Sequence, residues 1–337
     1  MSSNMIETHN LTKVYRRHLG IGTKASLDSL DLSIEKNEVF GFLGKNGAGK
    51  TTAIKILCGL VRPTRGTASI CGIDVRKRAA RAMVGYLPEN PYFYEYLNPK
   101  ETLAFYGKLK GLSWKERRAE RDKLFDLLDL GPIADQRVRE FSKGMRQRLG
   151  FAVALVGDPS LLILDEPMSG LDPVGRRAIR ELILLMSEQK KTIFFSSHVL
   201  GDVEQICDRV GILIDGRLSV TGRINELLTR KVDQVEVVAR GLPKAIVESI
   251  AKQCVQTRSS EQGAHFVLST IEKANDISYA IQTNGGTLVE FTPLRESLED
   301  YFMRTQAPSE QEEEPGPDQQ TEEPATPSQP DTENDAE

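Results

Sequence analysis

A glycine-rich stretch, GFLGKNGAGKTT, follows an apolar run and contains residue types that bind phosphate. Gly44 to Thr51 spell GxxxxGKT, with a strand-like pattern before the motif and a helical pattern after it. Glycines let several backbone N–H groups point at the same phosphate oxygens, and the positive end of the following helix attracts the same charge. We therefore predict a nucleoside triphosphate-binding loop formed by Gly44, Lys45, Asn46, Gly47, Ala48, Gly49, Lys50, Thr51 and Thr52.

Two side chains of this loop have predicted roles of their own. Lys50 should reach the β- and γ-phosphates, and the Thr51 hydroxyl should ligate Mg²⁺. A glycine-rich turn with a purely structural role would not need lysine and threonine at those two places. The loop is therefore interpreted as a binding site.

Two adjacent carboxylates, Asp165 and Glu166, come directly after a second apolar run, LLIL. Acids that follow four apolar residues are expected at the end of a buried strand, here beside the phosphate loop. Asp165 would then lie on the metal side of the site. Glu166 could orient or deprotonate the water that attacks the phosphate, so the pattern predicts hydrolysis of the nucleotide.

Strands and helices that could position these residues alternate along the chain. Apolar runs from Glu38, Leu161 and Lys191 have the pattern of buried parallel strands. A fourth run, RVGILIDGRL, contains the turn Asp215-Gly216, which leads back into another strand. Helical patterns lie between these runs. The order predicts an α/β fold whose sheet is covered on both faces.

The pattern divides the chain into a core, a small domain and a tail. The core spans residues 1–230 and includes a charged, helix-rich insertion at about residues 99–157. Residues 231–304 alternate three strands with two helices and end in a short helical pattern, RESLEDYFMR, so we predict a small α+β domain. It could supply dimer surface, which we favour, or a regulatory site that senses substrate. Residues 305–337 hold eleven acidic residues, six prolines and no Lys or Arg, which predicts a disordered acidic tail.

Charge and composition exclude several classes of protein. The net charge is −4, and the acidic tail leaves a formal +7 on the remainder, too small an excess to indicate nucleic acid binding. There is no apolar run of eighteen residues and no signal-peptide pattern, so we expect a cytosolic protein with no direct membrane insertion. The four cysteines lack CxxC spacing, which argues against a zinc site or a disulfide framework.

Several linked motifs together resemble the ATPase subunit of an ABC (ATP-binding cassette) transporter. LLILDEPMSGLDP is followed by FFSSH and preceded by FSKGMRQRL, and the glycine-rich loop stands before all three. The resemblance covers roughly residues 4–230 and implies a P-loop NTPase fold with a helical insertion subdomain. It also implies ATP and Mg²⁺ as cofactors.

The resemblance assigns roles to further residues. Ser142 and Gly144 match a signature motif that is donated to the γ-phosphate by the opposite subunit, and Asp172 matches a loop that crosses the dimer interface. His198 matches the switch histidine that contacts the γ-phosphate. Tyr15 is at the position where these ATPases stack an aromatic ring on adenine.

Two residues depart from the commoner family pattern. Lys143 replaces a glycine of the signature motif, where it could add a cation near the phosphate or remain a solvated lysine. Glu89 is found where many relatives have glutamine. Its carboxylate could approach the metal but would be repelled by phosphate.

After Glu89, the run PYFYEYL contains four aromatic rings in seven residues. Some of these rings could pack the helical insertion. A cluster this dense also suits a protein contact, so we predict that residues 89–97 (Glu89 to Leu97) receive a cytoplasmic helix of an integral-membrane permease.

These features predict an ATP-hydrolysing subunit of an ABC transporter, peripheral on the cytoplasmic face of the cell (inner) membrane. Because the signature motif cannot reach the phosphate loop of its own chain, two subunits are expected, in a homodimer arranged about a two-fold axis. ATP-driven closure would be coupled to solute export, which we favour over import, with no nucleic acid partner. The alternative is a soluble ABC ATPase that acts on ribosomes or DNA.

Overall fold

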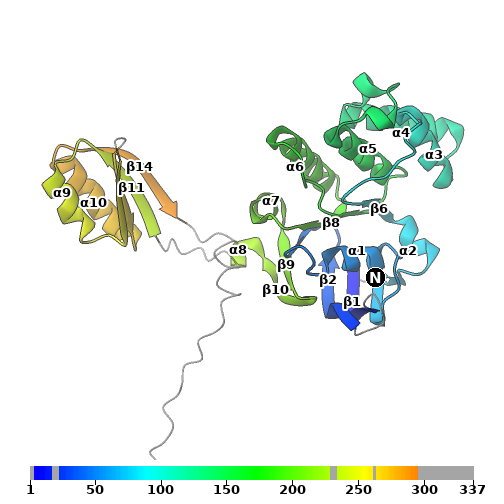
Figure 1. The fold of residues 1–337 in the computed structure, drawn as a ribbon, viewed down its shortest axis with the longest axis horizontal. Helices are drawn as coiled ribbons and strands as arrows, with labels where there is room; N and C mark the ends of the chain where they lie inside the picture. The colour runs from blue at the N-terminus through cyan, green and yellow to red at the C-terminus, as the bar shows by residue number, and fades with distance from the viewer. Residues whose placement is uncertain (1–3, 17–22, 228–233, 261–262, 295–337) are drawn as a thin grey trace, which may run out of the picture.

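The structure, a computed structural model, describes residues 4–16, 23–227, 234–260 and 263–294. Three sheets organise this part of the chain, and Figure 1 shows their arrangement. The predicted helix at RESLEDYFMR and the predicted acidic tail lie outside the described residues.

The central sheet has the strand order β10-β9-β3-β8-β7-β6. Its middle is parallel: β3 (Val39–Leu43) lies between β8 (Thr192–Ser197) and β9 (Arg209–Ile214), and β7 (Leu161–Leu164) lies between β8 and β6 (Val84–Leu87). The last strand, β10 (Arg217–Arg223), pairs antiparallel with β9. Every residue of β3, β7 and β8 is buried, as expected of parallel strands covered on both faces.

Parallel strands place their carboxyl ends at one edge, and the predicted chemistry follows three of those ends. The glycine-rich loop joins β3 to α1 (Lys50–Leu57), Asp165 follows β7, and His198 follows β8. Ligands in open α/β sheets bind at this edge. The fold therefore brings together residues that are more than a hundred positions apart in the sequence.

A second sheet, which the sequence reading did not anticipate, is antiparallel with the order β2-β1-β4-β5. Its strands are β1 (Asn4–Arg16), β2 (Thr23–Glu35), β4 (Arg65–Ile70) and β5 (Ile73–Asp74). Apolar residues of β1 and β2 share one core cluster with Phe40, Phe42 and Phe194 of the central sheet and with α1. Helix α1 is thus held by both sheets.

Helices α3 (Pro99–Leu109), α4 (Trp114–Leu128) and α5 (Lys143–Leu155) lie together beyond β6 in Figure 1. Asn98 and Ser113 form capping boxes with Glu101 and Glu116, which fix where α3 and α4 begin. The short helix α2 (Arg78–Ala82) precedes β6. Two further helices, α6 (Pro173–Glu188) and α7 (Leu200–Ile206), flank β8 in the sequence, and α8 (Ile224–Leu227) follows β10.

The third sheet belongs to a βαββαβ unit and has the order β12-β13-β11-β14. Its elements are β11 (Gln234–Arg240), α9 (Lys244–Ala251), β12 (Gln256–Ser260), β13 (Gly263–Leu268), α10 (Ile271–Thr283) and β14 (Thr287–Leu294). The expectation of three strands was wrong, because β12 pairs with β13 as a fourth. Both helices pack on one face of the sheet, in a core cluster separate from the other two.

The packing of the central sheet gives the first testable prediction. Phe194 is fully buried, and its ring stacks on Phe40 at 6.0 Å and contacts Phe42 at 5.3 Å between centroids. The substitution Phe194→Ala should lower the free energy of unfolding by about 3–5 kcal/mol, because it leaves a cavity in the core. Denaturant unfolding of the full chain measures this loss. The control is Tyr279→Ala, because Tyr279 is 73% exposed. Equal losses of unfolding free energy in the two variants would contradict the assignment of Phe194 to the core.

Candidate active site

Glycine is required in the phosphate-binding loop for two different reasons. Gly47 and Gly49 have φ values of 84° and 113°, a region that favours residues without a Cβ atom. At Gly49, a Cβ would also lie 2.2 Å from the carbonyl oxygen of Ser26. Because Gly49 is the N-cap of α1, its backbone conformation sets the direction in which the helix begins.

The loop borders a cavity of about 320 Å³. It is lined by Ser26, Lys45, Asn46, Gly47, Gly49, Lys50, Thr51, Thr52, Glu89, Glu166, Ser169 and His198. Two predicted loop residues are not among them: Ala48 is buried, and a Cβ at Gly44 would meet the carbonyl oxygen of Leu213 at 2.6 Å. These two residues therefore pack against the rest of the protein and do not face this cavity.

Lys50 lies at the centre of this site and is 5% exposed. Its Nζ donates to the carbonyl oxygens of Gly44 at 2.5 Å and Lys45 at 3.3 Å, and lies 3.1 Å from Oε1 of Glu166. That carboxylate oxygen makes no well-aligned hydrogen bond, so its contact with the ammonium is an ion pair without hydrogen-bond geometry. A buried lysine needs such compensation for the loss of water.

Asp165 is 1% exposed and holds its position through two hydroxyl groups. Ser196 Oγ donates to Oδ1 at 2.8 Å, and Thr51 Oγ1 donates to the same atom at 3.3 Å. Burial raises the pKa of Asp165, the two hydroxyl groups oppose that rise, and the neighbouring Glu166 and Glu89 carboxylates add to it. A cation beside Asp165 would therefore stabilise its charged form.

The Asp165–Thr51 pair fits Mg²⁺ in the chemistry of its donors. Mg²⁺ is held in nucleotide sites by one or two protein oxygen atoms, with phosphate and water completing its shell. Within the described residues there is no group of three or more His, Cys, Asp and Glu that could hold a metal ion. The oxygen donors that the structure brings together here are Thr51 Oγ1 and Asp165 Oδ1, 3.3 Å apart.

Glu166 adopts a left-handed backbone conformation, with φ of 48°. A residue with a side chain is held there at some cost, and its N–H donates to Ser196 Oγ at 2.9 Å. Its Oε2 atom lies 2.8 Å from Nδ1 of His198. Lys50, Glu166 and His198 therefore form one connected row of side chains, and Glu166 is in the middle.

Ser196 was not singled out in the sequence, although it contacts both carboxylate residues. Its hydroxyl donates to Asp165 and accepts from the Glu166 backbone, and it is fully buried. The available signal was a serine near the end of an otherwise apolar strand, FFSSH. The sequence could not show that this strand lies between the two strands that carry the phosphate loop and the carboxylates.

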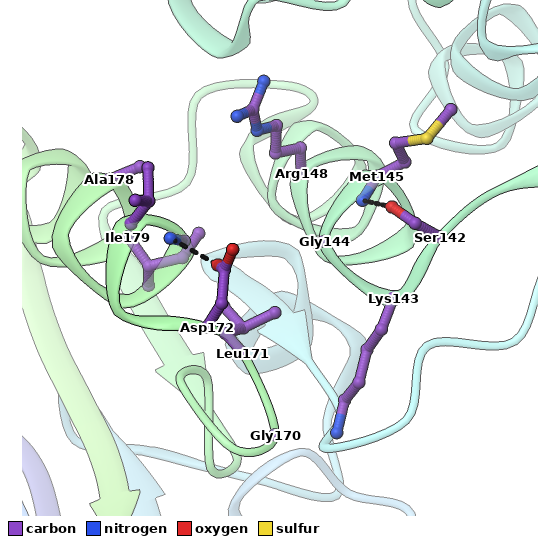
Figure 2. Close-up of a pocket in the computed structure, with 12 residues that line it drawn as sticks. Ser142, Lys143, Gly144, Met145, Arg148, Gly170, Leu171, Asp172, Ala178 and Ile179 are labelled. Carbon is purple, nitrogen blue, oxygen red and sulfur yellow. Dashed lines mark hydrogen bonds between the residues drawn. The ribbon is translucent and has the colours of Figure 1, made fainter.

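Ser142, Gly144 and Asp172 line a different cavity of about 440 Å³, shown in Figure 2. Ser142 is the N-cap of α5 and accepts a hydrogen bond from the Met145 N–H at 3.3 Å. Asp172 is the N-cap of α6 and accepts from the Gly175 N–H at 2.8 Å. The two cavities share no lining residue. One chain therefore presents the predicted residues as two separate groups.

Lys143 extends from the start of α5 toward Gly170, as Figure 2 shows. A Cβ at Gly170 would lie 2.2 Å from the Lys143 Nζ atom, so the ammonium lies against the loop that precedes Asp172. The Lys143 ammonium therefore lies beside the Gly170 loop of its own chain.

Of the predicted residues Tyr15 and Glu89, only Glu89 lines the first cavity. Tyr15 is 42% exposed, pairs with Lys24 on β2 and does not line the cavity. The ammonium of Lys13 lies 5.0 Å from the centre of its ring. Glu89 lines the cavity and is near enough to raise the pKa of Asp165. Stacking of Tyr15 on adenine stays a prediction.

Comparison with known proteins decides the family. A family model described as ABC transporter matches residues 27–169. An uncharacterised ABC transporter ATP-binding protein of Synechocystis is 40% identical over 308 residues, which are 90% of this chain and 85% of that protein. The chain belongs to the ABC transporter ATP-binding proteins. The bacitracin transport ATP-binding protein of Bacillus licheniformis is 35% identical over 308 residues, 90% of this chain and 97% of that protein.

The fold of this ABC ATPase is also found in solved structures. A dimeric ATP-binding cassette bound to ADP and phosphate matches with a TM-score of 0.61 at 24% identity, over 65% of this chain and 99% of that one. The predicted α/β P-loop fold is confirmed, and the protein is an ATP-binding, ATP-hydrolysing subunit. No helix in the described part of the chain is long and apolar enough to span a membrane.

The hydrogen bonds of Ser196 give a second testable prediction. Ser196→Ala removes a hydroxyl that keeps the pKa of Asp165 from rising further, so that pKa should increase. Because a protonated Asp165 has no negative charge with which to bind a cation, the acid limb of the ATPase pH profile should move to higher pH. Activity at neutral pH should fall roughly tenfold, because Glu166 also loses its backbone partner.

The matched control for Ser196→Ala is Thr8→Val. Thr8 is equally buried, and its hydroxyl donates to the Leu30 carbonyl at 2.9 Å, away from the site. Both variants should lose about 1–3 kcal/mol of stability. Only Ser196→Ala should change the pH profile, and an unshifted acid limb in that variant would show that Ser196 does not tune Asp165.

Proposed function

We propose that this protein is the ATPase subunit of an ABC exporter, peripheral on the cytoplasmic face of the membrane, which drives a separate permease. The main observation in support of an ATPase site is the connected row of Lys50, Glu166 and His198. Asp165 and Thr51 lie beside this row. The transport names of its relatives support the coupling to a membrane partner. The two separate sets of site residues support an ATPase dimer, and an exposed aromatic patch supports a contact with the permease.

In this proposal, the phosphates of ATP compete with Glu166 for the ammonium of Lys50. The backbone N–H groups of the glycine-rich loop would bind the same phosphates. Mg²⁺, held by Thr51 and Asp165, would neutralise phosphate charge. When Lys50 turns to phosphate, the Glu166 carboxylate loses its cation and becomes free to accept a proton from the attacking water. His198, whose Nδ1 lies 2.8 Å from Glu166 Oε2, would contact the γ-phosphate and hold that carboxylate in position.

A complete site would need a second subunit, and we favour an identical one. Ser142, Gly144 and Asp172 line a cavity of their own, so within one chain they do not complete the phosphate site. In a two-fold arrangement, the start of α5 from one subunit faces the ATP held by the other, and its helix end attracts the γ-phosphate. Two ATP molecules would then be enclosed between two chains.

The role of Glu166 gives a third prediction. Glu166→Gln keeps the size of the side chain but removes its ability to accept a proton, so turnover should fall about 10²–10⁴-fold. ATP would still bind, and the variant should accumulate as an ATP-bound dimer. Steady-state phosphate release and light scattering with and without ATP measure the two effects.

Glu181→Gln is the control for Glu166→Gln. Glu181 lies on the exposed face of α6, where it pairs with Arg177. Its variant should hydrolyse ATP at the wild-type rate and show no trapped dimer. Wild-type turnover in Glu166→Gln would instead show that another group activates the water.

An exposed aromatic patch beside the site supports a permease contact. We define it as Tyr92, Tyr94, Tyr96 and Phe105, and Tyr92 is 80% exposed. The Tyr94 ring contacts those of Tyr96 and Phe105 at 5.8 and 5.6 Å between centroids. Within the sequence PYFYEYL, residues 91–97, Phe93 is the only buried residue. Exposed clusters of this kind favour protein contacts.

The aromatic patch is joined to the segment that leads into α5. The N–H groups of Val138 and Arg139 donate to the carbonyl oxygens of Leu97 and Glu95 at 2.9 and 3.1 Å. Arg137 also donates to the Tyr96 carbonyl at 2.6 Å. A movement of the patch would therefore be transmitted to Ser142, three residues after Arg139. This link gives the permease a route to the signature helix.

We also propose that residues 231–304 form a domain apart from residues 1–230. Its buried residues, such as Val235, Phe266 and Ile281, make a core cluster of their own. Added dimer surface is the role we favour for it.

The permease surface gives a fourth prediction. Tyr92→Ala combined with Tyr96→Ala should reduce the amount of permease that copurifies from gently solubilised membranes by about tenfold, because buried aromatic side chains dominate interface energies. Mass spectrometry identifies the partner. Tyr279→Ala, which also removes an exposed tyrosine, should leave the recovery unchanged. Ribosomal or DNA-repair proteins in place of a multi-span protein would contradict the transporter and favour the soluble ABC class.

A further inference from the structure

A buried carboxylate outside the proposed chemistry connects two helices that follow site residues. Asp202 lies on α7, four residues after His198, and is 4% exposed. Its Oδ2 atom accepts from Arg176 at 3.1 Å, and its Oδ1 atom accepts from Arg180 at 3.4 Å. Each carboxylate oxygen thus has its own guanidinium, and both arginines come from α6.

The two arginines lie in the first half of α6. Asp172 is the N-cap of that helix, and Arg176 follows it by four residues and Arg180 by eight. Residues at this spacing share one face of a helix. Asp202 therefore fixes the start of α6, which carries Asp172, to the helix that begins just after His198.

The arrangement is a costly way to pack two helices. Two like charges four residues apart repel, and a cation in the first turn of a helix is disfavoured by the helix dipole. The Nε atoms of Arg176 and Arg180 are also buried with no hydrogen-bond partner in the described structure. Replacing a buried ion pair by apolar side chains is often neutral for stability. A role of Asp202, Arg176 and Arg180 in positioning the two helices would account for these charges.

We propose that Asp202 is a positioning residue that makes the Asp172 loop and His198 move together. His198 lines the first cavity and Asp172 lines the second, so this connection couples the two groups of site residues within one chain. The inference rests on the proposed dimer, in which each group serves a different ATP molecule. Through Asp202, the state of one ATP site is then transmitted to the other.

The test compares ATP hydrolysis by the full-length protein and by Asp202→Asn. The amide keeps the shape of the side chain but leaves two arginines without a balancing charge. We expect kcat to fall about tenfold, the size of a typical coupling between sites. The ATP concentration at half-maximal rate should change much less, because no group that contacts ATP is altered. The Hill coefficient for ATP should be lower than that of the wild type and approach about one.

Three variants separate positioning from folding. Arg177→Gln removes an exposed ion pair from the same helix, with Glu181 at 2.8 Å, and should match the wild type. Asp202→Glu restores the charge and should recover part of the cooperativity. Arg180→Gln leaves Asp202 with Arg176, so it keeps one ion pair in case Asp202→Asn does not fold, and it should show a smaller loss in the same direction.

The outcomes distinguish this inference from the proposed function. A folded Asp202→Asn or Arg180→Gln that keeps wild-type cooperativity would overturn the positioning role, provided that Glu166→Gln still forms an ATP-bound dimer. A Glu166→Gln variant that stays monomeric at saturating ATP would reject the dimeric site itself, and the coupling through Asp202 would fall with it.

Discussion

The ion pair between Lys50 and Glu166 is the interaction on which the geometry of the site depends. Both side chains are buried, and their charged atoms lie 3.1 Å apart. A buried charge without a partner is expensive, so each group needs either the other or a charged ligand. The pair therefore holds both side chains in place, and in the proposed function phosphate takes the place of Glu166 beside Lys50.

The order of strands in the central sheet makes this pair possible. Lys50 follows β3 and Glu166 follows β7, and β8 lies between those two strands. The carboxyl end of β8 supplies Ser196 and His198, which hold Glu166 from its backbone and from its carboxylate. A different strand order would leave Glu166 in its left-handed conformation without these partners. The sheet topology and the conformation of one residue are thus linked.

Much of this arrangement could be predicted from the sequence, because the phosphate loop and the carboxylates belong to local patterns. A strand, a glycine-rich loop and a helix are adjacent in the chain, and an acid after four apolar residues marks the end of a buried strand. Ser196 and Asp202 could not be predicted, since their partners are about thirty and twenty-two to twenty-six residues away. Strand β12 was missed because QTRSS has no alternation of apolar residues.

Two connections reach the second cavity from different places, and this constrains how a dimer can close. One runs from the aromatic patch through residues 95–97 and 138–139 to Ser142, and the other runs from His198 through Asp202 to Asp172. Both end at helix N-caps that line the same cavity, where a backbone shift changes the direction of the exposed N–H groups. In the proposed dimer, those groups meet the partner's ATP only when both N-caps are correctly placed. Closure would then require a signal from the permease and a signal from the nucleotide together, which is what coupling transport to hydrolysis demands.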